Sequence, residues 1–136
     1  MASRWYQKAM EFTKLGRLNV AIHCIDRALE AEPRNADLWL YKGVTLQKLG
    51  RHEEAIGCYD KAIEINPCHS MAWYNKGAAL GNQFRYREAV GCFDEAARQG
   101  HPSAFEAARA CRDEVEKSDV IQGRSSSGVR RKSKPR

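Results

Sequence analysis

The side chains best suited to chemistry in this sequence are those of four histidines and five cysteines. They form no HExxH metal motif, no CxxC pair, no phosphate-cradling glycine loop and no nucleophile elbow. Adjacent Cys68 and His69, with His101 further along the chain, are the only group that suggests a metal or a thiol–base pair, and they lack the ligand number that zinc requires. We therefore predict no catalytic residue, no metal site and no cofactor, and we interpret these residues as ordinary loop positions.

Three of the cysteines share one spacing, because Cys24, Cys58 and Cys92 follow one another at intervals of 34 residues. Helices in successive layers pack about 8 to 10 Å apart, whereas a disulfide needs Cα atoms within about 7 Å. We expect these cysteines to remain free thiols, which favours a reducing compartment.

The same interval relates many other positions. Trp5, Trp39 and Trp73 are 34 residues apart. The further matches are the sets Ala21, Ala55 and Ala89, then Ala28, Ala62 and Ala96, and the pairs Gly16 with Gly50 and Pro33 with Pro67. A fixed period of this length is typical of a solenoid, in which each unit buries its apolar face against its neighbours.

The unit resembles a tetratricopeptide repeat. The residues that carry the resemblance in the central copy are Trp39, Gly43, Leu46, Gly50, Ala55, Tyr59, Ala62 and Pro67. The copies span about 2–35, 36–69 and 70–102. The resemblance implies an all-α, right-handed α-α superhelix of three helical hairpins. Phe84 replaces the glycine between the helices of the third copy, so a less regular turn is expected there.

Local signals place the helices within each copy. Ser3 can cap a first helix that runs to about Leu15, and a second helix is expected from about Leu18 to Ala31. Gly16 suits the left-handed turn between them. Pro33 should end the second helix, since proline supplies no amide donor.

A different pattern begins after Pro102. Ser103 and Glu106 have the spacing of a capping box, and one narrow apolar stripe follows. We interpret 103–117 as a capping helix that covers the last layer, so that the repeat array spans 2–117. The segment 118–136 lacks periodicity and is expected to be a disordered basic tail.

The charge is concentrated in that tail. Residues 1–120 hold 17 Lys and Arg against 17 Asp and Glu, so the net charge of +6 lies in the last residues. A neutral body does not favour nucleic-acid binding by the repeats themselves. No apolar run approaches the roughly 18 residues of a membrane span, and no signal-peptide core is present, so we expect a cytoplasmic protein, with the nucleus as the alternative.

Partner contacts are implied by the resemblance rather than by composition. In this family the first helices line the concave face, and repeat positions two, five, six, nine, twelve and thirteen meet the partner. The matching residues that we take as the groove are Tyr6, Gln7, Met10, Lys14, Leu40, Tyr41, Val44, Lys48, Met71, Tyr74, Asn75 and Asn82. Exposure of the aromatic and apolar members would leave a strip of the kind that marks a protein or peptide partner.

One subtype of the family clamps a carboxylate with lysine, asparagine and arginine. Its positions are held here by Tyr6, Met10, Tyr41, Met71 and Asn75. A carboxylate would meet aromatic and thioether groups at these positions instead of the charged donors that make such hydrogen bonds strong. We therefore predict an interaction adaptor that binds an internal helix or extended segment in the groove, without a carboxylate clamp.

Two alternatives stay open. The basic run Arg130, Arg131, Lys132 and Lys134 could make the protein a nuclear or nucleic-acid-associated scaffold, or it could be a solvated end without a role. The first helix has no polar cap before it, so self-association through residues 1–31 is a further hypothesis.

Overall fold

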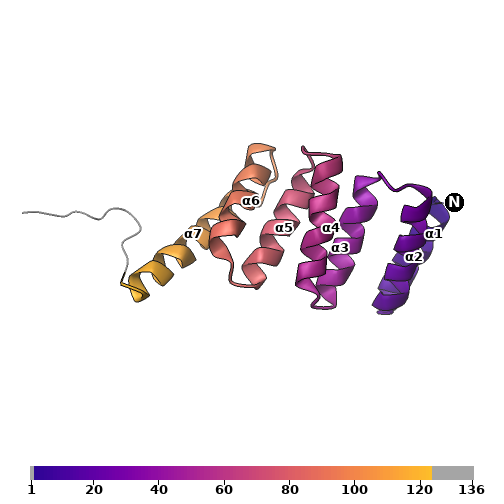
Figure 1. Ribbon diagram of the computed structural model, residues 1–136, viewed down its shortest axis with the longest axis horizontal. Helices are drawn as coiled ribbons and strands as arrows, with labels where there is room; N and C mark the ends of the chain where they lie inside the picture. Colours follow the sequence, from indigo (N-terminus) through magenta and orange to yellow (C-terminus); the bar gives the residue numbers. More distant parts are fainter. Residues whose placement is uncertain (1, 124–136) are drawn as a thin grey trace, which may run out of the picture.

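The computed structural model describes residues 2–123, and within this range it forms seven helices. The helices are α1 (Ala2–Lys14), α2 (Leu18–Ala31), α3 (Ala36–Lys48), α4 (His52–Ile65), α5 (Ser70–Asn82), α6 (Tyr86–Arg98) and α7 (Ala104–Ile121). Figure 1 shows them side by side in one row, with α1 and α7 at opposite ends. The expected all-α repeat solenoid is confirmed. Helix α2 has the predicted bounds, whereas α1 already includes Ser3, so Ser3 is not its cap.

The turn within each hairpin uses one residue in the left-handed region. Gly16 has φ 77° and Gly50 has φ 80°. Phe84 takes φ 63° at the matching point, and its amide donates to the Gly81 carbonyl at 2.9 Å, as the Gly50 amide does to Gln47 at 2.9 Å. The prediction of a less regular third turn is therefore wrong, because the phenylalanine accepts the strained conformation instead of changing the turn.

The connections between hairpins are held by side chains. Asn35 caps α3, since its Oδ1 accepts from the amides of Asp37 at 3.0 Å and Leu38 at 3.3 Å. The indole of Trp39 donates to the Pro33 carbonyl at 3.0 Å, and Trp73 makes the same bond to Pro67 at 2.9 Å. These bonds tie the start of each first helix to the turn before it, which fixes the spacing between hairpins.

The core consists of two adjoining clusters of buried side chains. The larger is built from α3 to α7 around Tyr59 and Phe93, and the smaller from α1 and α2 around Ile25, with Leu38 from α3. Trp39 packs against both clusters and so connects them. Because each layer is closed only by the next one, the array needs a helix at its end.

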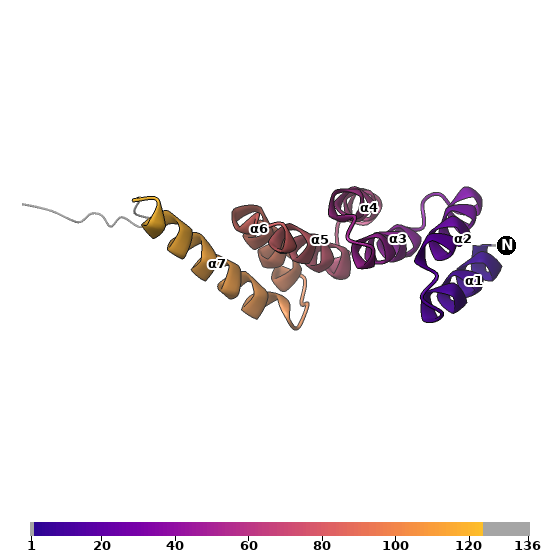
Figure 2. The same cartoon turned by 90° about the horizontal axis from the view of Figure 1, so that it is seen from below.

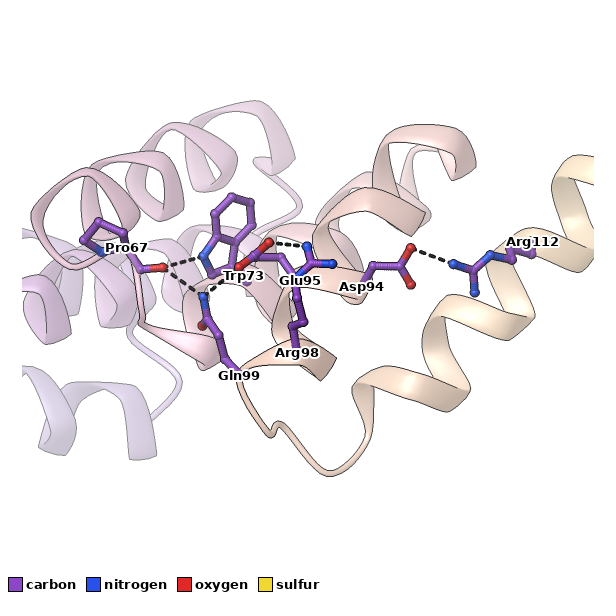
Figure 3. Close-up of polar contacts among 7 residues, drawn as sticks. All are labelled: Pro67, Trp73, Asp94, Glu95, Arg98, Gln99 and Arg112. Atoms are coloured by element: carbon purple, nitrogen blue, oxygen red, sulfur yellow. Dashed lines mark hydrogen bonds and ion pairs between the residues drawn. The ribbon is translucent and has the colours of Figure 1, made fainter.

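Ion pairs bridge successive hairpins at one repeated place. Lys42 Nζ lies 2.8 Å from Asp26, Lys76 Nζ lies 2.6 Å from Asp60, and Arg112 lies 2.6 Å from Asp94. Figure 3 shows the last of these pairs. It also shows the Pro67 carbonyl, which accepts from Trp73 and, at 2.9 Å, from Gln99. In each pair the aspartate belongs to the second helix of a hairpin, and its basic partner belongs to the next hairpin or to α7.

Helix α7 differs from its prediction at both ends. Ser103 has helical angles and makes no capping bond with its side chain, so the capping box is not formed. The helix also continues to Ile121, four residues past the predicted end at 117. Its last turn is held by Asp119, whose side chain is only 6% exposed and pairs with Arg87 of α6. A charged anchor of this kind leaves no trace in an apolar pattern, which explains the error.

Candidate functional site

The first helix of each hairpin presents one face to solvent. Figure 2 shows α1 and α3 on one side of the row and α2 and α4 on the other, and the row bends so that α1 and the start of α7 project on the α1 side. Along α1, residues 3, 7, 10 and 14 recur at helical spacing and are all exposed. We call the surface formed by these positions and their matches on α3, α5 and α7 the odd-helix face.

The twelve predicted groove residues divide by exposure. Those that are exposed are Gln7, Met10, Lys14, Lys48, Met71 and Asn82. Those that are half-buried are Tyr6, Leu40, Tyr41, Val44, Tyr74 and Asn75. The aromatic part of the expected strip is only partly exposed, because the tyrosines and Leu40 also pack against the core clusters.

Tyr6 and Tyr41 join α1 to α3. Their rings meet edge to face with centroids 5.3 Å apart, and the Tyr41 hydroxyl lies 2.8 Å from Thr13 Oγ1. An aromatic pair and a hydrogen bond of this kind position the first hairpin against the second. These two tyrosines therefore form the wall of the odd-helix face, with the exposed Gln7 and Met10 beside them.

Tyr74 joins α5 to the turn before α7. Its ring stacks on His101, with centroids 4.1 Å apart and an angle of 7° between the planes, and it meets Phe93 of α6 at 5.2 Å. The neighbouring Asn75 is half-buried, and Met71, one turn earlier, is 50% exposed. The apolar surface that α5 offers to a partner thus comes mainly from Met71.

The lysines at the ends of α1 and α3 are without partners. Within residues 2–123, the ammonium groups of Lys14 and Lys48 make no ion pair and no hydrogen bond. Lys42, by contrast, is bonded to Asp26 at 2.8 Å. At the start of α3, Asp37 lies 2.8 Å from His69 Nε2 and its side chain is 83% exposed. The odd-helix face therefore has free positive charge at the helix ends and a carboxylate at the start of α3.

Sequence reasoning missed Phe105, the second residue of α7. Its side chain is 64% exposed, and it follows Met71 by the 34-residue interval. The interval itself was the available signal, but α7 was interpreted only as a cap. Arg109, one turn further along α7, is exposed and pairs with Glu106 at 3.7 Å. Helix α7 thus extends the odd-helix face as well as closing the core.

A second exposed aromatic site lies at the turn between α5 and α6. Phe84 is 78% exposed and meets Tyr86 edge to face at 6.1 Å. A hollow of about 270 Å³ beside them is also lined by Val115 and Ser118 of α7. Phe84 is the only non-glycine residue of the described part of the chain with a positive φ. This site is separate from the twelve predicted groove residues.

Four of the five cysteines are buried in the fold. Burial raises the pKa of the Cys58 thiol to about 11 and raises the pKa of Cys92 and Cys111 as well. Such thiols are poor nucleophiles at neutral pH. His69 Nδ1 accepts the Ala72 amide at 3.4 Å as the cap of α5. Across residues 2–123, no three His, Cys, Asp or Glu side chains gather in a way that could hold a metal ion.

The remaining predicted site residues, Arg130, Arg131, Lys132 and Lys134, lie outside the described residues. A membrane-crossing role finds no candidate in residues 2–123, where every helix is too short or too polar to span a bilayer.

Comparison with known proteins links this architecture to one family. A tetratricopeptide-repeat model matches residues 6–69, and a second model of the same description matches residues 58–96. The search of curated sequences returned no significant match.

Solved structures of similar fold include three repeat domains. The Sgt2 domain from Aspergillus fumigatus has TM-score 0.82 and 16% identity over 97% of this chain and 90% of its own. The first domain of human RPAP3 has TM-score 0.81 and 20% identity over 88% and 96%. The first domain of Spaghetti (RPAP3), described as bound to the HSP90 peptide SRMEEVD, has TM-score 0.79 and 20% identity over 84% and 92%. Identities this low show a shared fold and do not identify a ligand.

Proposed function

The chain belongs to the tetratricopeptide-repeat family, and from that membership we propose that it is a protein-interaction scaffold that holds a partner polypeptide against the odd-helix face. Repeat arrays of this kind offer an extended binding surface on a rigid support. The observation that carries the proposal is that apolar Met10 and Met71 are exposed on the same face as the unpartnered Lys14 and Lys48. Apolar anchors next to charged groups are the usual composition of a polypeptide-binding surface.

The partner segment is proposed to be internal to its chain. A terminal carboxylate is bound most strongly by charged donors such as arginine and lysine. The positions that would supply them on α1 and α3 are Tyr6, Met10 and Tyr41, and two of these side chains are half-buried in aromatic contacts. On α5 they are Met71 and Asn75, so none of the five positions carries a cation. This supports the proposal that the partner is bound without a carboxylate clamp.

A selection from random peptides tests this proposal. Peptides displayed as internal segments, with both ends fused, are selected on the wild-type protein and then assayed against Met10→Ser/Met71→Ser. The two methionines are 38% and 50% exposed, so their replacement removes apolar surface without opening the core. Val20→Ser is the matched control, because Val20 is 36% exposed and belongs to α2, a helix that lies on the other side of the row. The proposal predicts at least a tenfold loss of affinity in the double variant alone. Equal affinity of the two variants, or no selected peptide at all, would refute it.

A second proposal is that the chain acts as a nuclear or nucleic-acid-associated scaffold by means of its basic tail. The supporting observation is that residues 121–136 hold six basic residues and no acid, whereas residues 1–120 are neutral. Truncation after Gly123 leaves α7 whole and removes all six of these basic residues. Salt-sensitive binding to a fluorescent RNA or DNA oligonucleotide should disappear in the truncated chain. Binding that survives the truncation would contradict a role of the tail.

Two further proposals follow from the sequence interpretation. A cytoplasmic location, with the nucleus as the alternative, agrees with five free cysteines, of which four are buried.

Self-association through α1 would cover Trp5, which Lys8 and Arg27 flank at 5.1 and 4.9 Å from the ring centroid. Sedimentation at several concentrations tests the second of these, and a constant monomer mass would exclude it.

A further inference from the structure

The charges along the odd-helix face are not evenly balanced. Four basic side chains on or beside the face have acidic partners, because Lys42 lies beside Asp26, Lys76 beside Asp60, Arg109 beside Glu106 and Arg112 beside Asp94. Lys14 and Lys48 are the thirteenth residues of the first and second copies. Both are exposed, and neither has an acidic partner within residues 2–123. These two cations therefore form a local positive patch at the ends of α1 and α3.

The apolar surface lies at the opposite corner of the same face. Met71 and Phe105 occupy the second position of α5 and α7 and are 50% and 64% exposed. Because α1, α3 and α5 are matching elements of one repeat, their first turns lie along one edge of the face and their last turns along the other, and α7 begins where the first helix of a further copy would begin. The apolar pair and the lysine pair are therefore separated both along the helices and across the row.

A carboxylate fixes the direction in which a partner can bind. Asp37, in the first turn of α3, has a side chain that is 83% exposed and lies 2.8 Å from His69 Nε2. An acidic side chain of a partner is repelled from this edge and attracted to Lys14 and Lys48 at the other. The charges thus disfavour the reversed arrangement, in which acidic residues would lie along the edge that carries Asp37.

We propose that the partner of the odd-helix face is an acidic segment with an apolar anchor, which crosses the face diagonally. A side chain such as Phe, Leu or Met contacts Met71 and Phe105, and two or more Asp or Glu side chains contact Lys14 and Lys48. Eleven residues of helix rise about 16 Å, and two intervals between neighbouring helices add about 20 Å across the row. An extended chain covers the resulting 25 Å or so with about eight residues. This inference rests on the proposed function and adds the chemistry and the spacing of its ligand.

The peptides selected on the wild-type protein test the spacing. They should combine an aromatic or large aliphatic residue with at least two acidic residues about six to ten positions away. Selected sequences without acidic residues, or with acidic residues next to the apolar one, would overturn the inference.

Titration of the strongest selected peptide tests the two contacts separately. Met71→Ser/Phe105→Ser should weaken binding at least tenfold. Lys14→Gln/Lys48→Gln should weaken it about three- to tenfold and reduce its sensitivity to salt, since two exposed ion pairs contribute modestly and are screened. The control Arg27→Gln/Lys61→Gln removes the same net charge from α2 and α4 and should leave the affinity within twofold.

Different results would contradict the acidic ligand alone and the proposed function as a whole. Suppose that Met10→Ser/Met71→Ser abolishes binding, while Lys14→Gln/Lys48→Gln binds as well as the control Arg27→Gln/Lys61→Gln. The face then binds a polypeptide, but the inference that its ligand is acidic is wrong. If neither methionine nor lysine replacement changes the affinity, both the proposed function and this inference are wrong.

Discussion

The ring of Tyr59 fills the space in which a side chain at Gly43 would begin. A Cβ atom built at Gly43 would lie 2.5 Å from Tyr59 Cε1, so α3 and α4 can approach this closely only because residue 43 is a glycine. The ring is fully buried, and its hydroxyl donates to Gln47 Oε1 at 2.6 Å. Gly77 and Phe93 repeat the relationship in the third hairpin, at 2.8 Å. Contact between the two helices of a hairpin thus depends on one glycine and one aromatic ring.

Replacement of Gly43 should therefore destabilise the array. In Gly43→Ala the new methyl group meets a ring that is held at both its face and its hydroxyl, so we expect a loss of about 1–3 kcal/mol in the free energy of unfolding. Gly57→Ala is the control, since its Cβ would meet nothing within 4 Å, and it should gain about 0.5–1 kcal/mol within α4. Urea unfolding followed by circular dichroism measures both. Equal stability of the two variants would contradict the close packing of Gly43 on Tyr59.

Phe84 is the residue at which the turn between α5 and α6 stores strain. Its φ of 63° lies in the region that disfavours side chains, and the ring is 78% exposed, so little apolar burial offsets the strain. Phe84→Gly should raise the free energy of unfolding by about 0.5–1 kcal/mol, net of the entropy that a glycine adds to the unfolded chain. Phe84→Ala keeps the strain and should remain near the wild type. A glycine variant less stable than the alanine variant would show that the ring contributes packing instead.

The pair between Arg87 and Asp119 should respond unequally to removal of its members. The Asp119 side chain is 6% exposed, whereas that of Arg87 is 62% exposed. Arg87→Ala leaves a buried carboxylate without its partner and should destabilise by about 3 kcal/mol, while Asp119→Ala leaves an arginine that water can solvate and should cost about 1 kcal/mol or less. Hydrogen exchange at the amides of α7 would locate the loss. Equal effects of the two replacements would contradict the burial of Asp119.

Alkaline pH should weaken the fold through its buried thiols. Burial raises the pKa of Cys58 from 9.0 to about 11, and it also raises the pKa of Tyr59. The folded state therefore favours the neutral thiol, whose contribution is fully present below about pH 9 and is lost as the pH rises through 11. For one such thiol, the free energy of unfolding should fall by about 2 kcal/mol over that pH range. Urea unfolding at several pH values measures the loss. Cys58→Ala should show a smaller decline, and an identical decline would assign the effect to other groups.

The fold could be predicted from the sequence because its signals repeat. The bounds of α2 followed from Gly16 before it and Pro33 after it, and the solenoid followed from the 34-residue interval. The end of α7 could not be predicted, because it depends on Asp119 meeting Arg87, 32 residues earlier, and an acidic residue in a polar segment gives no sign of burial.

The candidate site was harder to predict than the fold. The repeat positions identified which residues share the odd-helix face, but not which of them remain accessible. Tyr74 is half-buried because His101, in the turn before α7, stacks on it, and Tyr41 because it bonds to Thr13. The bond between Tyr41 and Thr13 joins two copies of the repeat, and the stacking of Tyr74 on His101 joins α5 to the turn that leads out of the third copy. A pattern read within one copy therefore predicts the position of a side chain and not its neighbours.

The most direct test of the central claim is to map bound peptide by nuclear magnetic resonance, since it needs no replacement of any residue. Titration of the labelled protein with a selected peptide should shift the backbone amides of Gln7, Val44, Met71 and Asn75, with few changes on α2 and α4. That result would locate binding on the odd-helix face. Shifts confined to the even-numbered helices, or to Phe84 and Tyr86 at the turn between α5 and α6, would contradict the account and move the site elsewhere on the array.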